Sequence, residues 1–107
     1  MSQGILASND LSTTGIDIQV YQVTNTKSAT FTIRVTNRSS STVKITLALV
    51  ASGTPTAKDY ICFNQPILPG DVYTEPGVVL GSQNLVFART DTSGVNVVIW
   101  GFEEAAS

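Results

Sequence analysis

Residues 28–50, SATFTIRVTNRSSSTVKITLALV, decide the fold class of this chain. Apolar and polar side chains alternate over residues 29–36 and again over residues 43–49, and a period of two places the apolar side chains on one face of a strand. The apolar members are Ala29, Phe31, Ile33, Val35, Val43, Ile45, Leu47 and Leu49. Residues 37–41 between the two runs are polar and typical of a turn. We therefore predict two strands that pair as an antiparallel hairpin with one buried face.

Short apolar segments of the same kind follow one another along the rest of the chain. They occupy residues 16–23, 60–63, 71–74, 78–80, 85–89 and 95–102, and Gly, Pro, Asn and Asp separate them. A change of face within the first of these segments indicates a bulge near Val20 and Tyr21. About seven or eight short strands without a helical period predict an all-β antiparallel sandwich, of jelly-roll or immunoglobulin-like type.

The first fourteen residues differ from the segments that follow. Residues 1–14 are polar except for three scattered aliphatic side chains, Ile5, Leu6 and Leu11. We predict that residues 1–14 form an extended N-terminal arm and that residues 15–104 form the sandwich domain. A polar arm is mobile unless something holds it. The aliphatic side chains indicate that the arm docks, either on its own sandwich or on a neighbouring molecule.

The last predicted strand is apolar on both faces. Val95, Val97 and Ile99 lie on one face, and Val98, Trp100 and Phe102 lie on the other. A strand that is buried on both sides needs a partner on each side. Either the strand is central in its sheet beneath other elements, or Trp100 and Phe102 meet another chain as interface anchors. We interpret the adjoining Glu103 and Glu104 as a solvated tail.

The composition argues against several classes of partner. Six basic and eight acidic residues give a net charge of −2, so the chain lacks the basic patch that nucleic-acid binding requires. No segment approaches the roughly 20 apolar residues of a membrane helix, and residues 1–10 lack the features of a secretion signal. We therefore expect a soluble protein that binds neither nucleic acid nor membrane. Only 13% of residues are charged, while fourteen are Thr and eleven are Ser, and such a surface is cheaply desolvated against a neighbour.

The residues of common enzyme chemistry are largely missing. The chain has no His, which removes the usual general base at neutral pH and the commonest zinc ligand. Most acidic residues fall at expected strand ends or turns, where carboxylates cap backbone groups. We predict no enzyme activity, no cofactor and no metal site, although Asp residues of separate loops leave a calcium site open. The single cysteine, Cys62, is interpreted as a buried core thiol, with an intermolecular bridge or a reactive thiol as the alternative.

Aromatic side chains suggest one further binding hypothesis. Tyr21, Tyr60, Tyr73 and Trp100 could form a platform on which sugar rings stack, as in carbohydrate-binding modules. The alternative is that these residues fill the core or close strand ends with a solvated hydroxyl group.

Several segments together resemble small accessory virion proteins of tailed bacteriophages. The resemblance lies in residues 34–50, in Asp59-Tyr60-Ile61, Leu68-Pro69-Gly70 and Glu75-Pro76-Gly77-Val78-Val79-Leu80, and in the final run from Val95 to Glu104 that ends in GFEE. It covers roughly residues 28–104 and contains no catalytic signature. Residues before 15 lie outside it.

The resemblance implies a structural protein of the phage particle that is assembled in the host cytoplasm. A capsid decoration (cement) protein that bridges neighbouring subunits is the first expectation. The partners are then the major capsid protein or other virion proteins, together with copies of itself, with a trimer favoured. The expected contact residues are Ile5, Leu6, Leu11, Trp100 and Phe102. A tail- or baseplate-associated protein, or a carbohydrate- or receptor-binding module, is the alternative.

Overall fold

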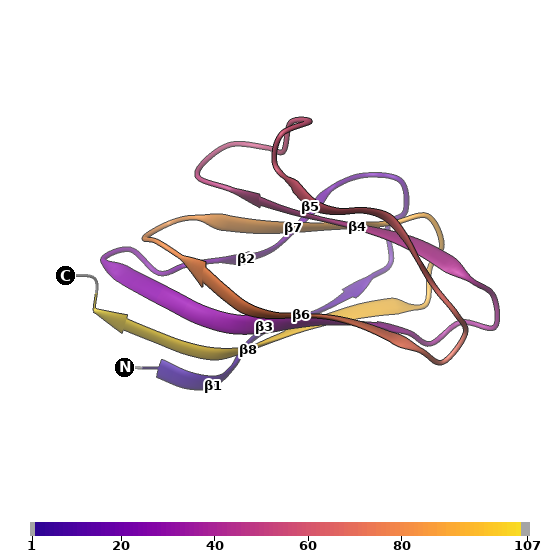
Figure 1. The fold of residues 1–107 in the computed structure, drawn as a ribbon, viewed down its shortest axis with the longest axis horizontal. Helices are drawn as coiled ribbons and strands as arrows, with labels where there is room; N and C mark the ends of the chain where they lie inside the picture. Colours follow the sequence, from indigo (N-terminus) through magenta and orange to yellow (C-terminus); the bar gives the residue numbers. More distant parts are fainter. Residues whose placement is uncertain (1, 106–107) are drawn as a thin grey trace.

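The computed structural model describes residues 2–105, which fold into eight antiparallel strands in two packed four-stranded sheets. The strands are β1 (Ser2–Leu11), β2 (Ile18–Gln22), β3 (Lys27–Asn37), β4 (Val43–Val50), β5 (Tyr60–Ile67), β6 (Val72–Leu80), β7 (Leu85–Thr90) and β8 (Val95–Ala105). Figure 1 shows the sheets as two layers. The predicted β-sandwich is confirmed.

The strand order of the two sheets is nested. Sheet A has the order β1-β8-β3-β6, and sheet B has the order β2-β7-β4-β5. The first strand therefore pairs with the last, the second with the seventh, the third with the sixth and the fourth with the fifth. A chain that folds back on itself in this way and then rolls up forms a jelly roll, one of the two sandwich types expected from the sequence.

The predicted hairpin between residues 29–36 and 43–49 is wrong. Strand β3 lies in sheet A between β8 and β6, whereas β4 lies in sheet B between β7 and β5. Each strand does bury the predicted face, but the two faces meet across the core instead of lying side by side. A period of two identifies the buried face and carries no information on the pairing partner. Within residues 2–105, β4 and β5 are the only consecutive strands that pair with each other.

The inner faces of the two sheets form one apolar core. Ile33, Val35, Leu47 and Ile99 are completely buried there. Burial of each such side chain stabilises the fold by about 1.5–3 kcal/mol. Tyr21 of sheet B and Phe31 of sheet A meet edge to face, with ring centroids 5.4 Å apart. The bulge predicted near Tyr21 is confirmed, because the pairing of β2 with β7 shifts between Gln19 and Tyr21.

Strands β5 and β6 are longer than predicted. The predicted segments ended at Phe63 and Thr74, whereas β5 continues through Pro66, and β6 continues through Pro76 and includes the segment 78–80 that was predicted separately. Both are edge strands, β5 of sheet B and β6 of sheet A. The missing N–H group of Pro66 or Pro76 costs little at an edge because one side of the strand has no partner. In β6 a register shift, with Gly77 at a φ of 69°, accommodates one extra residue between Glu75 and Val78.

Residues 2–11 of the predicted arm form an edge strand of the sandwich. Strand β1 pairs with β8 from Ser2 opposite Glu103 to Leu11 opposite Val95. Leu11 is buried in the core, and Leu6 packs against it. Of the two docking partners considered for the arm, its own sandwich is the one that the structure contains. Met1 lies outside the described residues.

Candidate functional site

The outer face of sheet A carries a group of apolar side chains from β1, β8 and β6. We call it the sheet A surface and define it by Ile5, Val79, Val98, Trp100 and Phe102. Residues that are opposite in register share a face of a sheet. Ile5 is opposite Trp100, and Phe102 is opposite Thr30, which is in turn opposite Val79. Ile5 is 74% exposed and Val79 is 69% exposed, while Trp100 and Phe102 are half-buried.

The structure brings together three of the five predicted contact residues. Ile5, Trp100 and Phe102 lie on this surface, whereas Leu6 packs against the core and Leu11 is part of it. A register shift between Ile5 and Ala7 separates the outward Ile5 from the inward residues that follow. Val79 was not among the predicted contact residues. Val98 was placed on the face of Trp100 and Phe102 but was not named as a contact, although the two-residue period of each strand puts both valines opposite the buried face.

A shallow hollow of about 200 Å³ lies in the middle of the sheet A surface. Its lining comprises Thr30, Phe31, Thr32, Gly77, Trp100, Gly101 and Phe102. A Cβ atom at Gly101 would collide with the carbonyl oxygen of Thr30 and would lie 2.6 Å from the Cα atom of Phe31. The glycine therefore allows the close approach of β8 to β3 beneath the hollow, between the two large aromatic side chains of β8.

Arg34 fixes the position of Trp100 on this surface. Its guanidinium carbon lies 5.3 Å from the centroid of the indole ring, a cation–π contact. The Nε atom of Arg34 also donates a hydrogen bond of 3.3 Å to Thr74 Oγ1. An aromatic anchor whose rotamer is already restrained loses less conformational entropy when it binds a partner.

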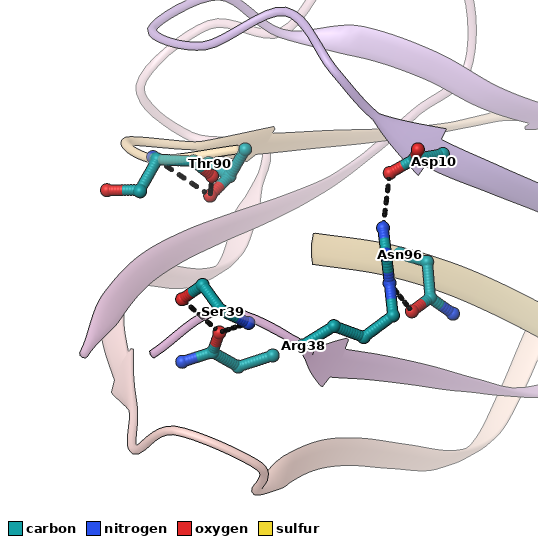
Figure 2. Close-up of polar contacts among 7 residues, drawn as sticks. Asp10, Arg38, Ser39, Thr90 and Asn96 are labelled. Carbon is teal, nitrogen blue, oxygen red and sulfur yellow. Dashed lines mark hydrogen bonds and ion pairs between the residues drawn. The ribbon is translucent and has the colours of Figure 1, made fainter. Parts of the chain in front are cut away.

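A polar cluster closes the end of sheet A at which β1 and β3 finish. Figure 2 shows Arg38 between Asp10 and Asn96. Its Nη2 atom lies 2.7 Å from Asp10 Oδ1, and its Nε atom donates a hydrogen bond of 3.0 Å to Asn96 Oδ1. Both members of the ion pair are at least half exposed, so the pair contributes at most about 1 kcal/mol. The cluster links the ends of β1 and β3 to the start of β8, but it adds little to the free energy of folding.

Glu103 is buried, which corrects its interpretation as part of a solvated tail. Its exposed fraction is 6%, whereas Glu104 is exposed. The two-residue period of β8 turns Glu103 inward after Val97 and Ile99. The hydroxyl group of Tyr21 donates a hydrogen bond to Glu103 Oε2, and the backbone N–H of Thr24 donates to the same oxygen at 3.3 Å. The carboxylate thus joins sheet A to β2 of sheet B.

The surroundings of Glu103 predict a loss of stability in acid. Burial alone would raise the pKa of Glu103, but the hydrogen bonds from Tyr21 and Thr24 outweigh burial and hold the pKa below its ordinary value of 4.5. Stability from this group is therefore complete above pH 4.5 and is lost as the pH falls through the lowered pKa of the folded state. We expect Glu103→Gln to unfold with a weaker pH dependence than the wild type in that acidic range, measured by urea titration at a series of pH values.

Glu104→Gln is the matched control because Glu104 is the exposed neighbour in the same strand. It should retain the pH dependence of the wild type. Equal acid slopes for Glu103→Gln and the wild type would contradict the role of the Tyr21–Glu103 pair.

The four aromatic residues considered as a sugar platform do not share a face. Tyr21 lies in the core, and Tyr73 packs against the core with its hydroxyl group donating to Glu75. Tyr60 is on the outer face of sheet B, opposite Ala48, while Trp100 is on the outer face of sheet A. A single stacking surface built from all four is therefore absent from this fold.

The structure places Cys62 in the core, and the prediction of a buried thiol is confirmed. Burial raises the pKa of Cys62, and its Sγ atom lies 3.9 Å from the carbonyl oxygen of Ile45. Within residues 2–105, no group of three or more Cys, Asp or Glu side chains is arranged to hold a metal ion. The described part of the chain also contains no helix long and apolar enough to cross a membrane.

Comparison with protein-family models, with curated proteins and with solved structures finds no match to this chain. The fold alone does not choose a function, because jelly rolls serve in viral capsids and in lectins alike. The chemistry of the exposed surfaces must therefore indicate what the chain binds.

Proposed function

We propose that this chain is a structural virion protein of a tailed phage, and specifically a capsid decoration protein that binds neighbouring capsid subunits through the sheet A surface. The observation that carries the proposal is the convergence of Ile5, Trp100 and Phe102 on one exposed face. The resemblance of residues 28–104 to accessory virion proteins is the reason for proposing a phage particle as the place where the chain acts.

The sheet A surface has the composition of a contact surface. A half-buried Trp and a half-buried Phe lie at its centre, and aromatic anchors of this kind dominate the binding energy of protein interfaces. Thr30 and Thr32 lie beside them on β3, and their hydroxyl groups are cheaper to desolvate than charged groups. A standard interface needs about 800 Å² from each partner. That area is roughly one seventh of the 5577 Å² that the chain exposes.

Repetition would turn a modest contact into a large stabilisation of the particle. Each copy that bridges two lattice subunits makes the second contact at a high effective concentration. Copies of this chain are proposed to associate with one another as well, with a trimer favoured because decoration sites follow the symmetry of the lattice. In this role the chain acts through binding, without catalysis, a cofactor or nucleic acid. A tail- or baseplate-associated protein would use the same surface on a different partner.

A particle-binding experiment tests the proposal. Purified chain is added to particles of the encoding phage that lack it, and the bound fraction is measured by co-sedimentation and by survival of the particles on heating. We expect wild-type protein to bind and protect. Trp100→Ala should bind at least about tenfold more weakly, because loss of an interface anchor costs about 2 kcal/mol or more.

Phe63→Ala provides the control, since Phe63 is an exposed aromatic residue of sheet B. It should bind particles as the wild type does. Failure of the wild type to bind, or an equal loss for Phe63→Ala and Trp100→Ala, would overturn the proposal. Thermal unfolding of each variant separates loss of binding from loss of fold.

A further inference from the structure

The outer face of sheet B, on the opposite side of the sandwich, carries a second and separate aromatic cluster. Ala48, Val50, Leu85 and Phe87 are buried on this face, and Tyr60 packs against them. The ring of Tyr60 meets the ring of Phe63 at a centroid distance of 5.3 Å. Phe63 is nevertheless 61% exposed, so a large part of an ordered aromatic ring faces solvent.

Arg89 of β7 is held against both rings. Its guanidinium carbon lies 5.6 Å from the centroid of Tyr60 and 5.7 Å from the centroid of Phe63. Its Nε atom is 3.9 Å from Asp17 Oδ1, a distance that permits charge attraction but is too long for a hydrogen bond. The other oxygen of Asp17 accepts a hydrogen bond of 3.2 Å from the Tyr60 hydroxyl group. Arg89 is thus positioned by packing and charge.

Hydrogen-bonding capacity remains unused around Arg89. The buried Oδ1 atom of Asp17 has no donor among residues 2–105, whereas the side chain of Arg89 is 26% exposed and its N–H groups face outward. Buried polar groups normally find partners, and an exception in an ordered site calls for an explanation. Arg89, unlike Asp17, lines an adjacent hollow, so a ligand there would meet the N–H groups of Arg89.

A hollow of about 150 Å³ adjoins this group. It is lined by Gly15, Lys44, Thr46, Asn64, Arg89, Thr90 and Asp91. Asn64 has a φ of 49°, and its backbone N–H donates a hydrogen bond of 3.0 Å to Thr46 Oγ1, which fixes the residue at the rim. A cavity of about 150 Å³ accepts a single six-membered ring such as benzene.

We propose that this hollow binds one ring of a neutral sugar, beside the exposed face of Phe63. Sugar hydroxyl groups donate and accept at once, which matches the guanidinium, amide, carboxylate and hydroxyl groups of the site. Lys44 and Asp91 line the hollow with opposite charges, and the charge of Arg89 is offset by Asp17, which lies 3.9 Å away outside the lining. The site therefore carries no excess charge that would select an acidic sugar. The C–H face of a sugar ring packs on an aromatic ring. Phe63 is not part of the lining, but it directly precedes the lining residue Asn64, and its ring centroid is 5.7 Å from the guanidinium carbon of Arg89, so it supplies such a ring beside the hollow.

This site is independent of the proposed particle contact, because the two lie on opposite outer faces of the sandwich (Figure 1). A chain held on a particle by sheet A would leave sheet B free. With many copies on one particle, weak binding at each single site would give high overall avidity for a surface coated with glycans.

The test is a nuclear magnetic resonance titration of isotope-labelled protein with methyl glycosides of glucose, galactose, mannose and N-acetylglucosamine, and with glucuronic and sialic acid as charged sugars. We expect at least one neutral glycoside to shift the backbone amide signals of Lys44, Asn64 and Arg89 in a saturable way. Phe63→Ala should weaken that binding by about tenfold.

Leu68→Ala is the matched control, because Leu68 is also 61% exposed. It should bind sugar as the wild type does. The proposal is overturned if no neutral glycoside shifts these signals at tens of millimolar, if the shifts map to sheet A, if only the charged sugars bind, or if both variants lose affinity equally. These outcomes are separate from particle binding, which the Trp100 variant reports.

Discussion

Gly101→Ala should lower the free energy of unfolding by about 3 kcal/mol, although it adds only one methyl group. The added Cβ atom would collide with the carbonyl oxygen of Thr30 and lie 2.6 Å from the Cα atom of Phe31. These are backbone atoms of β3, which pairs with β8 on one side and with β6 on the other. The clash therefore cannot be relieved by rotating a side chain, and the central pair of sheet A must separate. Urea unfolding followed by tryptophan fluorescence measures the loss.

Gly81→Ala is the control for this substitution. Its added Cβ atom would lie 3.3 Å from the side-chain oxygen of Asn84, which can move, and the residue is in an exposed turn. We expect a change below about 1 kcal/mol. Similar losses for the two variants would show that the close approach of β3 and β8 is not what requires glycine at position 101.

Alternation along the chain predicted the buried faces of β3, β4 and β8. It also put Trp100 and Phe102 together on the opposite face of β8, and left open whether other elements or another chain cover that face. It did not predict which strands pair. Ile33 and Leu47 alternate in the same way, but one belongs to sheet A and the other to sheet B. Pairing partners depend on contacts between residues far apart in sequence, and a jelly roll consists almost entirely of such contacts.

Only part of the sheet A surface could be predicted, because the two-residue period is clear in β8 and interrupted in β1. Strand β8 has an unbroken period of two, so Trp100 and Phe102 could be assigned to one face. Strand β1 contains a register shift after Ile5, which obscures its period, and the segment therefore resembled an arm. The cluster around Arg89 and Phe63 could not be predicted, because strands β5 and β7 and the residues before β2 meet there only through the fold.

Asn37 was predicted to begin a polar turn, but in the structure its side chain is a buried hydrogen-bonding group. It stands where the polar stretch 37–41 begins, yet it is completely buried. Its side-chain nitrogen donates hydrogen bonds of 2.8 Å to the carbonyl oxygen of Ser41 and 2.9 Å to that of Ile67. Its side-chain oxygen accepts from both the backbone N–H and the hydroxyl group of Ser39. One side chain thus holds the β3–β4 connection and the end of β5 together.

We expect Asn37→Ala to lower the free energy of unfolding by about 3 kcal/mol, since each buried backbone group left without a partner costs about 1–3 kcal/mol and water can reach some of them. Asn25→Ala is the control, because Asn25 is exposed and its side chain makes a single hydrogen bond of 3.3 Å to Ser82. Hydrogen exchange of the Ser39 and Gly70 amides should rise in the Asn37 variant more than exchange in β7, because local opening precedes global unfolding where the lost bonds lay. A loss no greater than that of Asn25→Ala would mean that the amide side chain is dispensable. The backbone bonds of Asn37, to the carbonyl oxygen of Asp71 and from the N–H of Gly70, would then be enough to hold this end of β3.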